Sequence, residues 1–345
     1  MLPNFFLAGA PKAGTTSLYH YLDQHPQIFM CPIKEPCYFG GEFRPENCSP
    51  EILPGVKRGQ RHLRRYLDGD MREHRFGGMV TEWGDYVRLF QHVRGETAIG
   101  EASPGYLWSE SAARNIHAKI PTAKILLILR DPADRAFSQY LRQVAVGGLR
   151  LTFRRQIEAN MRNRSRKASL QYPLLEFGLY HAQVTRFLEL FPRQNVCIHL
   201  YDDYRADPAA MMANTFRFLE VDDTFTPDTS QRHLELSVPR LAGVSHALHK
   251  LGVWQAIKKV TPRKLLPAAR QLAFVPRREI AMDPEDRRFL VDYYAEDILK
   301  LATLLNRDLS AWLQPDLGRK NTIPPAATKT TPNSTQESRL PKFAV

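Results

Sequence analysis

A short glycine loop between an apolar run and a helical run limits what this chain can fold into more than any other stretch. Residues 4–9, NFFLAG, are short and apolar and predict a buried strand. Residues 9–17, GAPKAGTTS, follow at once, and TTSLYHYLDQH then has helical character up to Pro26. A strand that turns through glycines into a helix aims backbone N–H groups at one point, where the helix dipole adds positive charge. The stretch therefore predicts an anion site in an α/β fold.

The anion of this loop is expected to differ from a nucleoside triphosphate. In a Walker A loop, G-x-x-x-x-G-K-[ST], the lysine contacts the β- and γ-phosphates and the hydroxyl binds Mg²⁺. Here Thr15 stands at the lysine position and the cation of the loop is Lys12. Gly9 and Gly14 would let the backbone approach the ligand, and Thr15 and Thr16 would offer hydroxyl donors. The alternative is a plain glycine turn with a solvated Lys12.

Two further strands and several helices predict a parallel sheet with helices on both faces. The strands are KILLILR at 124–130 and NVCIHLY at 195–201. Three Asp-Pro pairs, which begin at Asp131, Asp207 and Asp283, suit a helix cap followed by proline in the first turn. Strands that alternate with helices in this way are typical of an α/β domain.

The charge of the chain favours an anionic partner. Its 345 residues carry a formal net charge of +12, which suits a nucleotide, an acidic glycan, a phospholipid surface or nucleic acid. Basic residues concentrate in 142–175, interpreted as an insertion, and in 240–280, where cations mix with apolar residues. Each is either a solvated face or a surface for an acidic glycan or membrane glycolipid. Residues 1–314 are expected to form one domain and 315–345 a disordered tail.

Cysteine spacing and hydropathy favour a reducing, cytoplasmic location. Cys31, Cys37, Cys48 and Cys197 lack zinc-site spacing and are interpreted as isolated thiols, with a Cys31–Cys37 disulfide as the alternative. No apolar run reaches the roughly 18 residues of a membrane span, and no leader precedes the glycine loop. A peripheral contact of the protein with the inner face of the membrane is compatible with this location.

A second anion-binding group is expected where the second strand ends. Arg130 lies at the carboxyl end of strand 124–130, the edge at which open α/β sheets bind ligands. Ser138 follows about two turns into the next helix. A guanidinium and a hydroxyl could converge there on a second phosphate. The alternatives are an ion pair of Arg130 with Asp131 or Asp134, and a solvent-facing Ser138.

Together these stretches resemble a known enzyme family. PKAGTTSLY is similar to the 5′-phosphosulfate loop of the sulfotransferases that use 3′-phosphoadenosine 5′-phosphosulfate (PAPS), and RDPADRAFSQY is similar to their 3′-phosphate motif. HPQIFMCPIKEPCYF, GEASPGYLW and the closing DPEDRRFLVDYYAEDILKLATLLNRDLSAWL extend the resemblance over roughly residues 3–314. The chain thus resembles bacterial relatives of the Golgi glycan sulfotransferases.

The resemblance implies a P-loop-like three-layer fold with a central parallel sheet, PAPS as donor and no metal. It implies that Lys12 contacts the leaving 5′-phosphate and that Arg130 and Ser138 bind the 3′-phosphate. The other donor contacts that it implies are Ala13, Gly14, Thr15, Thr16 and Ser17. The lysine-glycine-arginine loop of the family is not found after the third strand, and Arg240, in SVPRL, is the best available substitute as a donor contact.

The resemblance also implies that Glu35, in KEPCYF, is the general base for the acceptor hydroxyl. The alternatives are a surface carboxylate paired with Lys34, and His20 or His25 as the base. The acceptor is expected to be a glycan or glycolipid rather than nucleic acid. Ala102 stands where the glycan enzymes usually have lysine, which argues against a heparan-like acceptor. A P-loop small-molecule kinase and a non-enzymatic polyanion-binding protein are the alternative functions.

Overall fold

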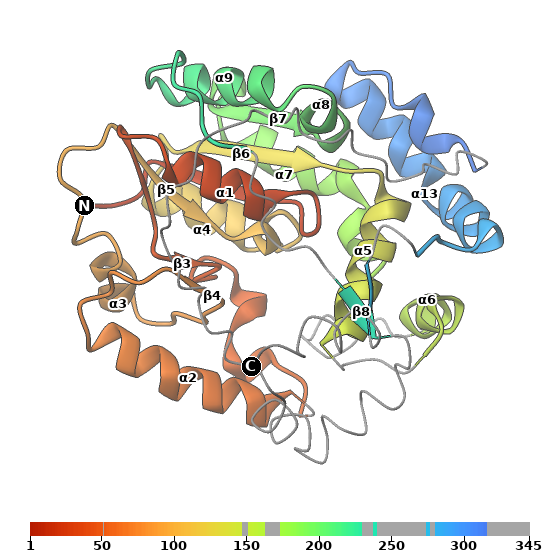
Figure 1. Ribbon diagram of the computed structural model, residues 1–345, viewed down its shortest axis with the longest axis horizontal. Helices are drawn as coiled ribbons and strands as arrows, with labels where there is room; N and C mark the ends of the chain where they lie inside the picture. Colours follow the sequence, from red (N-terminus) through yellow and green to blue (C-terminus); the bar gives the residue numbers. More distant parts are fainter. Residues whose placement is uncertain are drawn as a thin grey trace, which may run out of the picture.

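A sheet of five parallel strands forms the centre of the protein, as expected (Figure 1). The computed structural model describes residues 1–50, 52–146, 151–162, 173–229 and 280–315, and the backbone of 237–239 and 274–276. Across the sheet the order is β2-β5-β1-β6-β7. The strands are β1 (Phe5–Gly9), β2 (Ile28–Met30), β5 (Ala98–Ala102), β6 (Lys124–Leu129) and β7 (Val196–Leu200).

The three strands predicted from the sequence are confirmed, and two more complete the sheet. Every residue of β1 and β5 is buried, because helices cover both faces of a parallel sheet. Phe5 of β1 pairs with Gly100 of β5 on one side and with Lys124 of β6 on the other. Sequence reasoning missed β2 because it has three residues. It missed β5 because Gly100 and Glu101 are residue types that strands disfavour.

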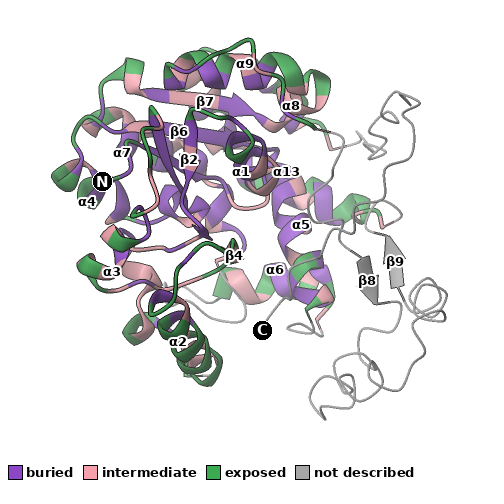
Figure 2. Ribbon diagram, turned by 60° about the vertical axis from the view of Figure 1, so that its left-hand side comes forward, coloured by how far each residue is buried: buried purple, intermediate pink, exposed green. Residues whose placement is uncertain are grey.

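Helices connect the strands and cover both faces of the sheet (Figures 1 and 2). The chain moves one way along the sheet from β1 to β2 and the opposite way from β5 to β6, so right-handed crossovers place α1 and α4 on opposite faces. The helices up to α5 are α1 (Thr15–Asp23), α2 (Leu53–Leu67), α3 (Trp83–Arg88), α4 (Ala112–Lys119) and α5 (Pro132–Ala145). Those that follow are α6 (Phe153–Arg162), α7 (Tyr180–Leu190), α8 (Tyr201–Ala206), α9 (Pro208–Leu219) and α13 (Pro284–Leu305).

Two small sheets lie outside the central one. β3 (Ile33–Lys34) pairs in parallel with β4 (Arg75–Phe76), and α2 lies between them in sequence. β8 (Ser237–Pro239) pairs antiparallel with β9 (Phe274–Pro276). The β3–β4 pair matters for the site because the chain continues from β3 directly into Glu35.

All three Asp-Pro pairs begin helices, as predicted. Asp131 accepts hydrogen bonds from the N–H groups of Ala133 and Asp134 at the start of α5. Asp207 caps α9 and Asp283 caps α13 in the same manner. Each carboxylate satisfies N–H groups that lack a partner within the helix.

The structure bears on the expectations for the cysteines, for a membrane span and for the basic segments. All four cysteines are free thiols, so the Cys31–Cys37 disulfide is wrong. The part of the chain that the structure describes has no helix long and apolar enough to cross a membrane. Within 142–175, α6 buries Phe153 and Ile157. Arg240, most of 240–280 and residues 316–345 lie outside the described residues.

Candidate functional site

The two motifs predicted to bind anions meet at one edge of the sheet. Strands β1 and β6 are neighbours, and the chain leaves them toward opposite sides of the sheet, which makes their carboxyl ends the switch point where α/β folds bind ligands. The Arg130 Nη1 donates a hydrogen bond of 3.2 Å to the backbone carbonyl oxygen of Lys12. Residues 118 positions apart in sequence are therefore in direct contact.

Gly14 has a conformation and a close neighbour that both favour glycine. Its φ is +95°, a left-handed value that costs other residues energy. A Cβ at this position would lie 3.1 Å from the Tyr201 ring. No side chain caps α1 at Gly14, and the amides of a first helical turn have no partner within the helix. The amides at the start of α1 are therefore placed as donors that an anion could accept from.

The side chains of the loop are exposed to different degrees. Ala13 and Thr15 are buried, whereas Lys12, Thr16 and Ser17 are half-buried. The buried residues can serve a ligand through their backbone, and the half-buried ones through an ammonium or hydroxyl group.

Gly9 differs from Gly14 because its neighbour is part of the protein core. A Cβ on Gly9 would lie 2.4 Å from the Leu107 Cβ, so the packing of Leu107 explains this glycine.

The Arg130 side chain is buried between an aromatic ring and a carboxylate. Its side chain is 6% exposed, and its guanidinium carbon lies 4.7 Å from the centre of the Tyr201 ring. The ion pair with Asp134 that was considered as an alternative is present but long, with 3.8 Å between Nη2 and Oδ2. The buried Nε has no hydrogen-bond partner among the described residues. A buried cation with spare donors fits an anionic ligand.

Ser138 is buried, so the solvent-facing alternative is wrong. It lies four residues after Asp134 on α5, and residues at this spacing share one face of a helix. Ser138 is therefore one turn further along the face on which Asp134 approaches Arg130.

Glu35 lies at the same sheet edge as the loop and Arg130. Its backbone N–H donates to the carbonyl of Ala102, the last residue of β5, at 2.8 Å. Its carboxylate pairs with the buried Lys34 ammonium at 2.8 Å and is 44% exposed. Desolvation lowers the pKa of Arg142, at the end of α5, and the nearby Glu35 charge opposes this shift. Glu35 thus faces α5 and also makes the Lys34 pair that was considered as its alternative role.

One of the two histidines considered as alternative bases is part of the core. His25 is buried, with its ring 4.6 Å and 4.8 Å from the rings of Phe216 and Phe225. It follows the end of α1, opposite the glycine loop, and its role is structural.

Glu101 is a buried acid that sequence reasoning did not single out. Tyr86 and Tyr106 donate to its Oε2 at 2.9 Å and 3.1 Å. Burial raises the pKa of Glu101 to about 7, although these hydrogen bonds act against the shift. The Tyr106 hydroxyl also accepts from the Phe39 N–H, so this network fixes the chain that follows Glu35. An acid inside GEASPGYLW was the signal that could have revealed it.

Helix α2 adds a basic surface that sequence reasoning also missed. Gln60 of α2 donates to the Met79 carbonyl at 3.0 Å, and the neighbouring Gly78 N–H donates to the Glu35 carbonyl at 3.0 Å. The helix is largely exposed (Figure 2). Its basic surface consists of the exposed residues Lys57, Arg58, Arg61 and Arg65. This surface is thereby fixed to the segment that holds Glu35.

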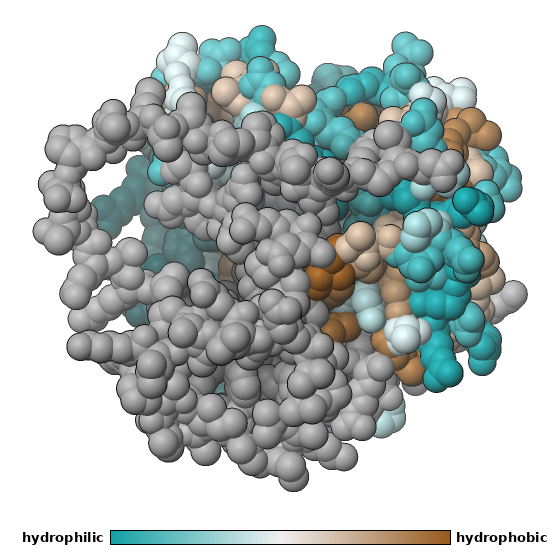
Figure 3. All heavy atoms as spheres, turned by 45° about the vertical axis from the view of Figure 1, so that its right-hand side comes forward, coloured by the Kyte–Doolittle hydropathy of each residue, from teal (hydrophilic) through white to brown (hydrophobic). Residues whose placement is uncertain are grey.

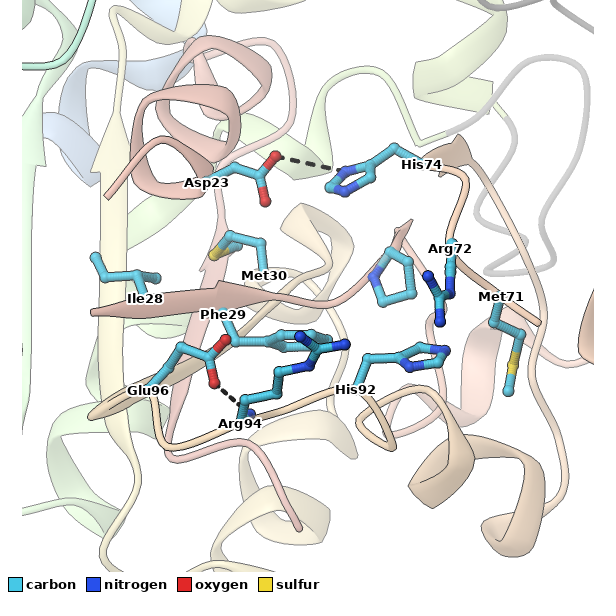
Figure 4. A pocket seen from close by; sticks show the side chains of 11 residues that line it. Asp23, Ile28, Phe29, Met30, Met71, Arg72, His74, His92, Arg94 and Glu96 are labelled. Carbon is cyan, nitrogen blue, oxygen red and sulfur yellow. Dashed lines mark hydrogen bonds and ion pairs between the residues drawn. The ribbon is translucent and has the colours of Figure 1, made fainter. Parts of the chain in front are cut away.

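A cavity of about 340 Å³ lies elsewhere, beside the edge strand β2 (Figure 4). Its lining includes Asp23, whose carboxylate lies 3.6 Å from the His74 Nδ1. Figure 4 shows these two side chains pointing toward each other, with Arg94 and Glu96 on the other side of β2. The cavity contains none of the predicted site residues and is separate from the glycine loop.

Surface hydropathy and the arrangement of possible metal ligands are two further features of the described residues. Over the described part of the face in Figure 3, hydrophobic and hydrophilic side chains are interspersed. Within the described ranges, no group of three His, Cys, Asp or Glu side chains is arranged to hold a metal ion.

Comparison with known proteins points to one family. The sequence profile of the Sulfotransferase family matches residues 3–226. Human bifunctional heparan sulfate N-deacetylase/N-sulfotransferase 3 is 28% identical over 324 residues, which cover 92% of this chain and 32% of the human protein. Type 1 of the same enzyme from Xenopus laevis is 29% identical over 323 residues, 91% of this chain and 31% of the frog protein. The chain therefore spans about a third of the length of these relatives.

A solved structure agrees with this comparison. The crystal structure of a sulfotransferase from Alicyclobacillus acidocaldarius superposes with a TM-score of 0.66 and 30% sequence identity. The match covers 91% of this chain and 100% of that chain. The likeness therefore extends well beyond the two anion-binding motifs.

Proposed function

Because the chain belongs to the sulfotransferase family, we propose that it transfers the sulfuryl group of PAPS to a hydroxyl of a carbohydrate or glycolipid. The contact of Arg130 with the Lys12 carbonyl carries the proposal, since it brings two anion-binding motifs to one place. A nucleotide with a 5′-phosphosulfate and a 3′-phosphate offers one anionic group to each motif. ATP lacks the 3′-phosphate and would leave Arg130 without its ligand.

The residues of the glycine loop would hold the 5′ end of the donor. The amides at the start of α1, with the hydroxyls of Thr16 and Ser17, donate hydrogen bonds to an anion. Ala13 and Thr15 are buried and contribute through their backbone. Arg130 and Ser138 would bind the 3′-phosphate, where a guanidinium forms strong charge-assisted hydrogen bonds.

Lys12 and Glu35 would carry the chemistry. Glu35 accepts the proton of the acceptor hydroxyl while the hydroxyl oxygen forms the new bond to sulfur. The bond from sulfur to the bridging phosphate oxygen breaks, and its electron pair stays on that oxygen. Lys12 stabilises the charge that develops there. The products are a sulfate ester and adenosine 3′,5′-bisphosphate (PAP).

A sugar acceptor is supported by the relatives and by α2. The curated relatives are named as heparan sulfate enzymes, and the exposed cations of α2 suit an acidic chain. Ala102 still argues against an acceptor identical to theirs. The same names specify N-sulfotransferases, so an amino sugar is the second acceptor candidate.

Nucleotide titration by calorimetry tests the donor. We expect tight binding of PAP without metal and weak binding of ATP–Mg²⁺, with Arg130→Ala abolishing the preference for PAP. Preferential binding of ATP–Mg²⁺ would instead favour the small-molecule kinase. Transfer of labelled sulfate to glucosamine-containing and hydroxyl-only oligosaccharides then separates the two acceptor candidates.

Substitution of Glu35 tests the base. Glu35→Gln should lower kcat by about 10²–10⁴-fold, the usual contribution of a general base, and leave PAP affinity unchanged. Lys12→Ala should lower kcat as well, with a normal circular dichroism spectrum. His20→Ala is the matched control for the alternative base. Near-normal turnover by Glu35→Gln would remove Glu35 from the mechanism.

A further inference from the structure

Arg287, outside both anion-binding motifs, makes the strongest contacts to the acids beside Arg130. It lies in the first turn of α13 and its side chain is 7% exposed. Its Nη2 donates to the Asp131 Oδ2 at 2.8 Å, and its Nη1 donates to the Asp134 Oδ1 at 2.9 Å. One guanidinium therefore bridges both carboxylates at the start of α5.

Asp134 is shared unequally between two arginines. Its Oδ1 lies 2.9 Å from Arg287, and its Oδ2 lies 3.8 Å from the Arg130 Nη2. The first distance is that of a charge-assisted hydrogen bond, and the second is too long for a hydrogen bond. The geometry thus assigns this carboxylate to Arg287.

The charges of the cluster show why this assignment matters. Two guanidinium groups, Arg130 and Arg287, face two carboxylates, Asp131 and Asp134. Without Arg287, the buried Asp131 and the partly buried Asp134 would have only Arg130 as a nearby positive partner within this cluster. Arg130 would then be neutralised by protein acids, and an incoming phosphate would meet their negative charge.

We propose that Arg287 is a positioning residue of the donor site: by holding the Asp134 carboxylate, it leaves the Arg130 guanidinium available for the 3′-phosphate. The inference rests on the proposed donor and adds a residue from the C-terminal helix to its site. Arg287 acts on the ligand through Asp134 and Arg130.

Titrations with PAP and with 5′-AMP, which lacks the 3′-phosphate, isolate this effect. The Kd for AMP divided by the Kd for PAP measures the 3′-phosphate preference, and a larger ratio means a stronger preference. Arg287→Gln should lower this ratio at least about tenfold while the Kd for AMP changes less than about twofold, because only the charge at Arg130 is altered. Adding Asp134→Asn to Arg287→Gln should restore most of the ratio, since the competing carboxylate is gone.

Arg154→Gln is the matched control. Arg154 makes an ion pair of 2.5 Å with Asp286, also in the first turn of α13, but no described contact joins it to Asp134. This variant should keep the wild-type ratio.

Each result decides between distinct conclusions. If the wild-type protein shows no preference for PAP, the proposed donor fails and the inference fails with it. If the preference survives in Arg287→Gln, only the inference is overturned. If it is lost but Asp134→Asn does not restore it, the role of Arg287 is purely structural and the inference is also overturned.

A variant that does not fold still leaves a test. Removal of one partner of a buried pair is strongly destabilising, so Arg287→Gln can fail to fold. Asp134→Asn alone then decides, with Arg287 intact. A preference for PAP equal to or above that of the wild type supports the inference, whereas a loss of preference overturns it.

Discussion

At Glu101, burial and hydrogen bonding act on one carboxyl group in opposite directions, and burial dominates. The pKa rises from its ordinary value of 4.5 to about 7. The folded protein therefore holds this proton more tightly than the unfolded chain. The resulting stability is fully present below pH 4.5 and is lost as the pH rises through about 7.

Glu101→Gln should remove this pH dependence. A shift from 4.5 to about 7 corresponds to about 3 kcal/mol. Relative to the variant, the wild-type free energy of unfolding should fall by up to that amount between pH 5 and pH 8, as measured by urea denaturation. Glu296→Gln, at an exposed site on α13, is the control and should track the wild type. A constant difference between wild type and Glu101→Gln across this range would contradict the pKa.

Single residues also show how much of the candidate site could be predicted from the sequence. Lys12, Arg130 and Ser138 were predicted as site residues because each follows a strand or lies on the helix after it, and their roles stay predictions. Tyr201 was not identified as a neighbour of Arg130, nor was Arg287 as a partner of the acids beside it. Tyr201 reaches Arg130 only after β7 pairs with β6, and Arg287 reaches Asp131 and Asp134 only after α13 packs on α5. Such contacts have no local signal.

At the scale of elements, helix caps and apolar strands were predictable, whereas the three-residue strand β2 and the strand β5, which contains glycine and glutamate, were not. Each Asp-Pro pair begins a helix because the cap is formed by residues adjacent in sequence. The strand β5 was missed because its Glu101 is stabilised by Tyr86 and Tyr106, which lie outside the strand. Tertiary contacts there override the local preference.

Helix α2 should affect the acceptor and not the donor. Charge reversal in Arg58→Glu/Arg61→Glu should raise KM for a carboxylated or sulfated oligosaccharide by about tenfold, since these cations would attract it. KM for a neutral oligosaccharide and the Kd for PAP should stay unchanged. Initial rates at varied acceptor concentration and two salt concentrations check this.

Arg114→Glu on α4 provides the control for α2. Arg114 is also exposed, but α4 lies on the face of the sheet opposite α1. An equal rise in KM for Arg114→Glu would indicate a general effect of net charge rather than a role for α2.

At the scale of the whole molecule, the proposed donor site combines distant parts of the chain. The glycine loop follows β1, Arg130 follows β6, Tyr201 follows β7 and Arg287 begins α13. A ligand that binds only the assembled site stabilises the folded chain by about 2.7 kcal/mol at a hundredfold excess over its Kd. PAP should therefore raise Tm in thermal denaturation, with Arg130→Ala as the control variant. An equal rise in that variant would place PAP elsewhere.

The hydrogen bond from Arg130 to the Lys12 carbonyl has a consequence for the lifetime of the protein. It joins the ends of two neighbouring strands at the point where the nucleotide would bind. Proteases act on opened chains, so degradation follows the population of the open form when opening is fast. A bound donor nucleotide would lower the population of the open form. The concentration of that nucleotide would then set how long the protein persists as well as how fast it turns over.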